Sequence, residues 1–539
     1  MRPACWTARS SPSSRPTCAS QGPRATGRNA VDLEHRLIKE RFAKLDKWAE
    51  MGVEPYPHRF SRSHEIGEVL ADADAMVEAG TEVRVAGRMM SKRRHGKLGF
   101  SGLTDESGQV QLFVRKDIVG EENYEVFKLL EVGDFAGANG KVMRTKTGEL
   151  SIEVQSIELL SKSLRPLPEK WHGLQDTELR YRQRYVDLVM NPEVRETFRK
   201  RARIIQVVRE VLLAAGFTET ETPVLQPVYG GATARPFTTI HHALGEAKLY
   251  LRIADELYLK RLIVGGFDRV FEIAKNFRNE GIDRTHNPEF TMMECYAAYW
   301  DYNDMMRLVE EIVGKLAAEF AEDGKLQYGE HEIDFSNGFR RVTFLDLLEE
   351  HTGTDFAPMD RDAVAAVAKD MGIEVTDAMG KAKLLDEIFS LKAEPSLIQP
   401  TFVCDHPVEL SPLAKRHPEN PELVERFEPF IAGFEIGNSF SELNDPRDQR
   451  TRFMEQVELG KRGDQEAQQL DEDFLRALEY GMPPTGGLGI GLDRLVMLFT
   501  GSHSIRDVLL FPQLRPELAE PAKPKRGGGK PDAEGGKSG

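Results

Sequence analysis

The stretch RVFEIAKNFRNEGIDRTHNPEFTMMECYAAY, residues 269–299, decides how this chain folds and what it binds. It predicts a strand from Val270 to Ile273, a polar turn and a second strand. Arg278 offers a planar fork of donors for a phosphate or carboxylate, and Phe290 offers a flat apolar face for a purine ring. The alternative is an exposed hairpin, whose surface ion pairs contribute only about 0–1 kcal/mol each. We favour a binding loop.

A second informative stretch is GGLGIGLDRLVMLFTGSHSIRDVLLFP, residues 486–512. Closely spaced glycines, ending at Gly491, let a backbone approach a ligand. Arg494 follows at the start of an apolar helix. Glycine spacing alone is weak evidence, but the adjacent arginine predicts a second cation for an anionic ligand.

The segment 195–225 predicts a long helix that stops at Gly216, followed by a strand that ends at Pro223. Its apolar stripe is wide, so the helix is expected to be buried on more than one side. Core packing is the simpler explanation, and a dimer interface is the alternative.

Residues 81–160 contain several short alternating segments separated by turns, which predict a small β-barrel of the OB-fold type. In QVQLFVR, Val110, Leu112 and Val114 share one face of a strand. Gln111 and Phe113 share the other face, which suits stacking on a splayed base. A second packed face or a chance exposed phenylalanine is the alternative for this strand.

Composition limits the function classes without choosing one. The chain has 539 residues, 40% hydrophobic and 29% charged, which predicts a soluble protein of two or three domains. No apolar run reaches the roughly 18–20 residues that span a bilayer, so we expect no membrane segment. The four cysteines lack metal-site spacing, which favours a reducing, cytoplasmic compartment. The net charge of −15 allows a nucleic-acid partner only through a local basic surface.

These patterns predict an α+β chain with consecutive domains. Residues 1–30 are arginine-rich and acid-poor, and we expect a disordered extension, with a mis-assigned start or a transit peptide as alternatives. An amphipathic helix over 32–50 places Phe42 and Trp48 on its apolar side and Arg41 on its basic side. The predicted boundaries are 31–165 for helix plus OB-fold, 166–180 for a linker, 181–514 for the catalytic domain with a helical insertion near 359–395, and 515–539 for a disordered tail.

Together the FRNE…HNPEF and GLGIGLDR runs resemble motifs 2 and 3 of class II aminoacyl-tRNA synthetases, and 195–225 resembles motif 1. The order of an OB-like domain and then these motifs resembles the aspartate/asparagine/lysine subgroup. YGGATARPF, LRIADELYLKRL, EIGNSFSELND and LIQPTFV are similar to bacterial-type lysyl-tRNA synthetases. The resemblance covers about residues 31–514. It implies an antiparallel catalytic sheet flanked by helices, a homodimer, and a ligase that joins L-lysine to tRNA(Lys) using ATP.

The resemblance also implies roles for individual residues. Arg278 and Arg494 are expected to be catalytic, with adenine between Phe290 and Arg494. The other expected ATP contacts are Glu280, His286, Asn287, Glu428, Glu435 and Gly491, of which Glu428 and Glu435 would also hold Mg²⁺. Besides Arg278, the expected lysine contacts are Gly231, Glu256, Glu294, Tyr296, Asn438 and Glu442. The expected anticodon contacts are Phe100, Gln111 and Glu149. Some relatives carry arginine just before the motif 2 histidine, where this chain has Thr285, with Arg284 one position earlier.

Four alternatives remain at this point. An aspartyl- or asparaginyl-tRNA synthetase shares the fold, but the acid-rich pocket favours an amine. A protein-modifying lysine ligase lacks the OB domain, and a lysyl-phospholipid synthase needs a membrane segment. A non-catalytic RNA-binding protein would not need Arg278, Phe290 and Arg494.

Overall fold

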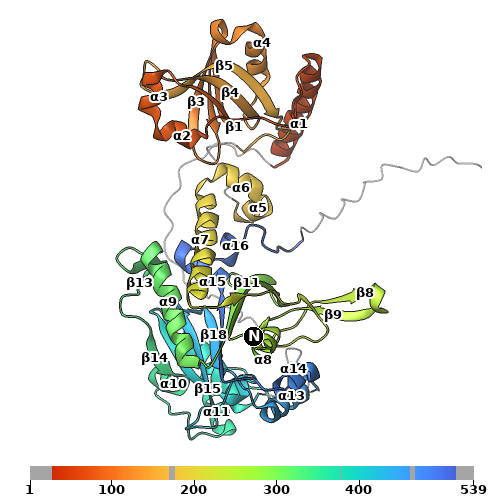
Figure 1. Cartoon of the computed structure of the whole chain (residues 1–539), viewed down its shortest axis with the longest axis vertical. Coiled ribbons are helices and arrows are strands. Elements are labelled where there is room, and N and C mark those ends of the chain that lie inside the picture. Colours follow the sequence, from red (N-terminus) through yellow and green to blue (C-terminus); the bar gives the residue numbers. More distant parts are fainter. Residues whose placement is uncertain (1–26, 169–175, 378, 462–467, 517–539) are drawn as a thin grey trace, which may run out of the picture. The chain divides into compact units, whose positions relative to one another are not determined.

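The structure is a computed structural model that describes residues 27–168, 176–377, 379–461 and 468–516 (Figure 1). Two compact units divide the chain between residues 175 and 176. The expected extension over 1–30 and tail over 515–539 lie almost wholly outside the described residues, although helix α1 already begins at Gly27. No helix in the described ranges is both long and apolar enough to cross a bilayer.

The first unit is a closed five-stranded barrel with the strand order β1-β2-β3-β5-β4. Val110, Leu112 and Val114 of β3 are buried inside it, whereas Gln111 and Phe113 are partly exposed, as their alternation predicts. The OB-fold expectation is therefore confirmed. The strands are β1 (Glu82–His95), β2 (Leu98–Thr104), β3 (Gln109–Arg115), β4 (Phe135–Arg144) and β5 (Leu150–Ser161).

Helix α1 (Gly27–Glu50) corrects one detail of the sequence analysis. Trp48 is buried as expected, but Phe42 is 52% exposed and Arg41 is buried. The Arg41 guanidinium donates to the carbonyl oxygens of Val132, Ser163 and Arg165, at 2.9–3.2 Å. Periodicity could not reveal these distant backbone acceptors. The other helices of this unit are α2 (Ile66–Ala71), α3 (Ala73–Ala79) and α4 (Lys116–Leu129).

The second unit is built on a nine-stranded sheet whose main path is β14-β15-β16-β18-β19-β11-β10-β6. Most pairs are antiparallel, as expected, but the β14–β15 and β10–β6 pairs at the two edges are parallel, so the sheet is mixed. Its strands are β6 (Thr218–Glu219), β10 (Arg269–Phe277), β11 (Glu289–Ala298), β14 (Arg340–Thr343), β15 (Thr401–Pro407), β16 (Leu423–Ile431), β17 (Phe434–Glu435), β18 (Gly437–Ser441) and β19 (Thr485–Gly491).

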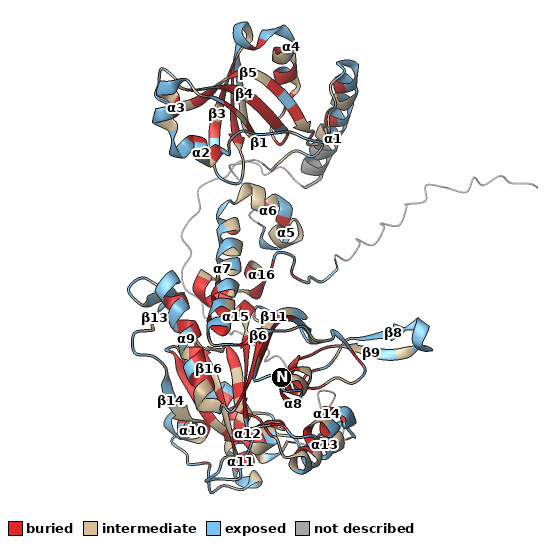
Figure 2. Ribbon diagram, in the orientation of Figure 1, coloured by how far each residue is buried: buried red, intermediate tan, exposed pale blue. Residues whose placement is uncertain are grey.

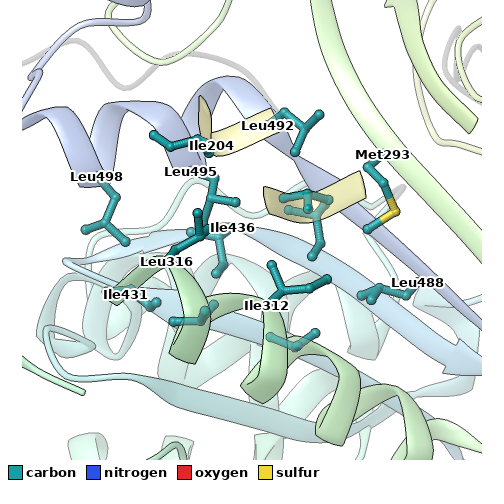
Figure 3. Packing of buried hydrophobic residues seen from close by; sticks show 14 of the residues in the cluster. Ile204, Met293, Ile312, Leu316, Ile431, Ile436, Leu488, Leu492, Leu495 and Leu498 are labelled. Atoms are coloured by element: carbon teal, nitrogen blue, oxygen red, sulfur yellow. The ribbon is translucent and has the colours of Figure 1, made fainter. Parts of the chain in front are cut away.

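Three helices bury one face of this sheet: α7 (Glu193–Ala214), α9 (Tyr302–Phe320) and α15 (Leu492–Thr500). Figure 3 shows Ile204, Ile312 and Leu495 from these helices packed with Met293 and Leu488 from the strands. Figure 2 shows the buried residues concentrated on the sheet and on the helix faces toward it. Helix α7 ends just before Gly216, whose φ of +81° suits a helix stop.

Smaller elements complete the unit. The segment 359–395, expected to be helical, contains α11 and α12, which share a separate core with α10. A three-stranded sheet has the order β7-β9-β8, and β12 pairs with β13. Their bounds and those of the remaining helices are β7 (Leu225–Gln226), β8 (Thr238–His241), β9 (Ala247–Leu251), β12 (Lys325–Tyr328), β13 (His331–Asp334), α5 (Thr177–Arg182), α6 (Arg184–Met190), α8 (Glu256–Val264), α10 (Phe344–Thr352), α11 (Arg361–Asp370), α12 (Lys381–Lys392), α13 (Pro446–Lys461), α14 (Glu472–Glu479) and α16 (Ile505–Val508).

One buried carboxylate ties the three motif segments together. Asp493, at the start of α15, accepts a hydrogen bond from the Thr291 backbone N–H of β11 at 2.7 Å. Its other oxygen pairs with the Arg201 guanidinium of α7 at 2.5 Å. Both side chains are largely shielded from water, with 3% and 14% exposure.

We predict that Asp493→Ala destabilises the second unit by about 3–5 kcal/mol, because Arg201 keeps its charge but loses its buried partner. Thermal unfolding followed by circular dichroism measures the change. The matched control is Glu319→Ala. It removes an exposed ion-pair partner of Arg203, which lies on α7 as Arg201 does, and it should barely change the unfolding temperature. Equal shifts in the two variants would contradict the role given to Asp493.

Candidate active site

The β10–β11 hairpin presents Arg278 and Phe290 at its open end. The two strands pair from Arg269↔Ala297 to Phe277↔Glu289, so residues 278–288 form the connecting loop. The Arg278 backbone N–H donates to the Pro288 carbonyl at 2.9 Å, which closes the base of the loop. The Arg278 guanidinium carbon lies 5.0 Å from the centre of the Phe290 ring. A cation and a flat apolar ring are thus held side by side.

Strand β19 and helix α15 bring Arg494 to the same place. Strand β19 pairs with β11, with Met292 opposite Gly491, and α15 begins one residue later. The Arg494 guanidinium donates to the Glu435 carbonyl at 2.7 Å and lies 3.3 Å from the Glu435 carboxylate. Arg278 and Arg494 line one cavity of about 310 Å³, together with Phe290 and Gly491. The structure therefore brings together the two cations that the sequence analysis singled out.

Arg278 is poised for an anionic ligand. Burial lowers its pKa, while the charges of Glu280 and Glu435 oppose that shift. Its guanidinium makes a long 3.5 Å hydrogen bond to the Ile253 carbonyl. Guanidinium groups stay protonated in proteins, so Arg278 remains a cation whose hydration is largely lost, and a phosphate or carboxylate would replace that hydration well.

Another part of the cavity lining, here called the acidic end, consists of buried acids. Glu256, Glu294 and Glu442 line it with Tyr296, and each of these side chains is buried. Glu256 is the first residue of α8, where a helix N-terminus favours negative charge. Glu442 follows β18, and its backbone N–H donates to the Thr485 carbonyl at 2.8 Å. The Tyr296 hydroxyl donates to the Glu294 carboxylate at 3.1 Å.

Burial dominates the electrostatics of these acids. It raises the pKa values of Glu294 and Glu442 well above their usual range, and the charge of Glu256 adds to both shifts. The pKa of Asp255, next to the cavity, is raised to about 6 for the same first reason. Buried carboxylates favour a cationic ligand, because an ammonium offsets the cost of their lost hydration.

Gly231 and Asn438 also line the cavity. Gly231 has a φ of +86°, and a Cβ there would lie 3.0 Å from the Cβ atoms of Ala254 and Glu256. A side chain at this position would therefore be both strained and crowded. The Asn438 side-chain oxygen accepts a hydrogen bond from the Arg426 guanidinium at 2.9 Å.

Three predicted ATP contacts of the motif 2 loop line the cavity as well: Glu280, His286 and Asn287. The His286 ring lies 2.8 Å from the Asp283 carboxylate. The Asn287 amide donates to the Glu289 carbonyl at 2.6 Å, and its oxygen accepts from the Gln513 N–H at 3.1 Å. Asn287 is thus held by backbone groups.

The shifted arginine of this loop does not line the cavity. Arg284 is exposed, and its backbone carbonyl accepts a hydrogen bond from Ile505 at 2.7 Å. Thr285, the residue before the motif 2 histidine, does line the cavity. The geometry therefore gives no support to Arg284 as a substitute for the missing arginine.

The two predicted metal ligands differ in position. Glu435 lines the cavity, but Glu428 does not belong to its lining. Glu428 pairs with the Arg426 guanidinium at 2.5 Å. Burial raises the pKa of both acids, and the Glu428 charge raises that of Glu435 further, which indicates that the two carboxylates are close. Two hard oxygen donors beside a phosphate site fit the chemistry of Mg²⁺.

The predicted base-reading residues of the barrel lie on neighbouring strands. Phe100 of β2 is paired opposite Phe113 of β3, and their rings stack with centres 5.0 Å apart. Gln111 lies beside Ser151 of β5, whose hydroxyl donates to the Gln111 side-chain oxygen at 3.0 Å. The same hydroxyl lies 3.3 Å from the Glu149 carbonyl oxygen. The three predicted residues therefore share one region of the barrel.

Three residues that no sequence pattern singled out also support the site, and two of them, Arg426 and Asp493, line the cavity themselves. Lys260, Arg426 and Asp493 each pair with a residue around the cavity or hold its frame. Lys260 follows Glu256 by four residues on a helix, which is the usual spacing of an ordinary surface ion pair. That spacing alone could not reveal its burial.

Comparisons with known proteins agree with this geometry. A family model described as class II tRNA synthetases for D, K and N matches residues 176–515, and an OB-fold nucleic acid binding domain matches residues 83–160. The lysine–tRNA ligase of Syntrophomonas wolfei is 55% identical over 486 residues, which cover 90% of this chain and 98% of that protein. The lysine–tRNA ligase of Carboxydothermus hydrogenoformans is 52% identical over 490 residues, which cover 90% and 100%.

A third relative, the lysine–tRNA ligase of a Roseiflexus species, is 54% identical over 485 residues, which cover 89% of this chain and 99% of that protein. Both units of the chain are thus matched. The chain belongs to the class II lysyl-tRNA synthetases, with an N-terminal OB-fold domain.

Proposed function

We propose that this chain is a lysine–tRNA ligase that condenses L-lysine with ATP and then transfers the lysyl group to the 3′ end of tRNA(Lys). The observation that carries the proposal is a single cavity lined by Arg278 and Arg494 and by the buried carboxylates of Glu256, Glu294 and Glu442. The arginines suit the negative charge of a triphosphate, and the carboxylates suit the positive charge of a long amine.

ATP occupies the arginine end in this proposal. Phe290 stacks on adenine, and Arg494 covers the opposite face of the purine. Arg278 binds the α-phosphate and the lysine carboxylate together. Glu280, His286, Asn287 and Gly491 supply the remaining contacts, which their presence in the cavity lining supports.

Glu428 and Glu435 hold Mg²⁺ in this proposal, and when bound the ion neutralises charge on the phosphates. Before ATP enters, Arg426 and Arg494 balance these two carboxylates. The arginines thereby oppose the rise in pKa that burial causes in these two acids.

Lysine occupies the acidic end. Its ammonium lies among Glu256, Glu442 and the Tyr296 hydroxyl, while Gly231, Glu294 and Asn438 contact its α-carbon groups. Each charge-assisted hydrogen bond contributes about 1.5–3 kcal/mol, enough to replace the hydration of the ammonium. An aspartate ligand would instead place its carboxylate among buried carboxylates, which disfavours the aspartate-specific members of the family.

The chemistry proceeds by alignment and needs no protein nucleophile. The lysine carboxylate attacks the α-phosphorus in line, and pyrophosphate leaves. Arg278 stabilises the negative charge that develops on the α-phosphate. The terminal ribose hydroxyl of the tRNA then attacks the carbonyl carbon of lysyl-adenylate, and AMP leaves.

We further propose that Phe100, Gln111 and Glu149 read the anticodon on the OB barrel. Phosphate contacts supply much of the affinity for tRNA, so this affinity falls with salt. A homodimer and a cytoplasmic location complete the proposal, and both rest on the family resemblance.

Amino-acid-dependent exchange of pyrophosphate into ATP tests the function. We expect exchange with L-lysine and little with aspartate, asparagine or arginine, because only lysine supplies a side-chain ammonium of matching length and shape. Radiolabelled pyrophosphate measures the rate. Faster exchange with any of the other three amino acids would refute the lysine assignment.

Gly487→Ala tests the geometry of the acidic end. A Cβ at this position would overlap the Glu442 carboxylate and approach the Tyr296 ring to 2.6 Å. We expect lysine affinity to fall about ten- to a hundredfold, the equivalent of one charge-assisted hydrogen bond. Calorimetry with L-lysine measures it. Gly314→Ala on α9, where a Cβ meets no atom within 4 Å, is the control. Unchanged affinity in Gly487→Ala would remove Glu442 from the amine site.

Phe100→Ala tests the barrel. Because stacking on an aromatic ring contributes about 1–3 kcal/mol per base, the KM for tRNA(Lys) should rise about fivefold or more. Pyrophosphate exchange without tRNA should not change. The control is Leu70→Ala, an exposed apolar side chain on α2 of the same unit. A normal KM for tRNA in Phe100→Ala would place the anticodon elsewhere.

A further inference from the structure

A lysine of the protein itself lies behind the acidic end of the cavity. Lys260 of α8 is fully buried, and its Nζ is 2.5 Å from the Glu256 carboxylate and also contacts the Glu442 carboxylate. Glu256 and Glu442 belong to the cavity lining, whereas Lys260 does not. The two acids therefore face the cavity on one side and share an internal ammonium on the other.

The remaining surroundings of Lys260 are aromatic. Its Nζ lies 5.9 Å from the ring centre of Tyr296, 5.3 Å from that of Phe440 and 6.0 Å from that of Phe474. These rings belong to β11, β18 and α14. Among the contacts of Lys260 with the described residues, the charged partners are the two carboxylates. Such a cage favours an ammonium that stays charged.

The net charge of the Glu256, Glu442 and Lys260 side chains indicates what this cluster can bind. When both acids are ionised, two carboxylates and one ammonium leave one negative charge in a buried site, because −2 and +1 sum to −1. The Glu442 Oε1 atom is buried without a hydrogen-bond donor. A buried negative charge without a counter-ion, with one carboxylate oxygen unpaired, destabilises the protein until a cation binds.

The more distant charged groups do not remove this excess. Arg426 exerts a smaller effect on Glu256 than Lys260 does, and it already pairs with Glu428. Glu294 adds negative character on the cavity side and is bound by the Tyr296 hydroxyl. The acid pair thus has room for one further positive charge.

We propose that Lys260 is an internal counter-ion that sets the Glu256–Glu442 pair to accept a single substrate ammonium, and so acts as a positioning residue for lysine recognition. This inference rests on the proposed function of the cavity. With Lys260 in place, the bound substrate brings the cluster to neutrality. Without it, the pair is over-charged and retains a proton that competes with the substrate.

A charge-compensation cycle tests the proposal with the full-length chain and L-lysine as the titrant. Glu256→Gln leaves Glu442 and Lys260 to neutralise each other, so lysine binding should weaken about a hundredfold or more, since the excess charge and a charged acceptor are both lost. The double variant Glu256→Gln/Lys260→Met restores one net negative charge. Its lysine affinity should recover about tenfold or more relative to Glu256→Gln.

A purely structural role for Lys260 predicts the opposite order, because its loss would then add damage to Glu256→Gln. A double variant that binds lysine no better than Glu256→Gln, or that unfolds while Glu256→Gln stays folded, overturns the proposal. The matched control is Glu332→Gln/Lys325→Met, which alters an exposed pair and should leave lysine binding unchanged.

The single variant Lys260→Met supplies an independent readout. Without Lys260 the acid pair should hold a proton more tightly, so the lysine dissociation constant of this variant should fall as pH rises, at pH values below the usual amine pKa near 10.4. The native chain should show a shallower fall, because Lys260 lowers the pKa of Glu442 against the effect of burial. A flat profile in a folded Lys260→Met variant also overturns the proposal.

Lysine binding by the native chain and by Glu442→Gln distinguishes a failure of the proposed function from a failure of the role of Lys260. If the native chain does not bind lysine, or if Glu442→Gln leaves lysine binding intact, the cavity is not an amine site. If the native chain binds lysine and Glu442→Gln weakens it, a cycle without recovery rejects only the role of Lys260.

Discussion

The structure depends on keeping opposite charges in one cavity without letting them neutralise each other. Arg278 and Arg494 line this cavity, and so do the buried Glu256 and Glu442. Direct pairing of the two sets would cancel the attraction for both ligands. Local ion pairs limit such pairing: Lys260 contacts Glu256 and Glu442, Arg426 pairs with Glu428, and Arg494 pairs with Glu435. Arg278 is left as the cation with the greatest need for an anion.

The fold supplies the rigidity that this separation needs. The central strands β11 and β19 run side by side, and Asp493 of α15 links β11 to α7 through buried hydrogen bonds. Glycine at 487 leaves space for the Glu442 carboxylate and the Tyr296 ring, so the acidic end is shaped by the absence of a side chain. If any of these elements shifted, a charged group would move away from the hydrogen-bonding distance to its partner.

Much of this could be read from the sequence because its signals are local. Alternation identified the barrel strands, and the clustering of Arg278 and Phe290 identified the hairpin loop. The resemblance then grouped residues that are distant in the chain, such as Glu256 and Glu442. Other features depend on long-range contacts that no pattern encodes. Arg41 looks like a surface cation but binds distant carbonyls, Lys260 looks like half of a surface pair, and the parallel edges of the main sheet require knowledge of which strands meet.

The central claim is that one cavity holds a triphosphate at its cationic end and a long amine at its acidic end. A crystal structure of the chain with L-lysine and a non-hydrolysable ATP analogue tests it most directly. The account predicts the ε-ammonium within hydrogen-bonding distance of both Glu256 and Glu442, and the purine between Phe290 and Arg494. A lysine side chain directed away from these two carboxylates, or a nucleotide bound outside the Arg278–Arg494 end, would contradict it.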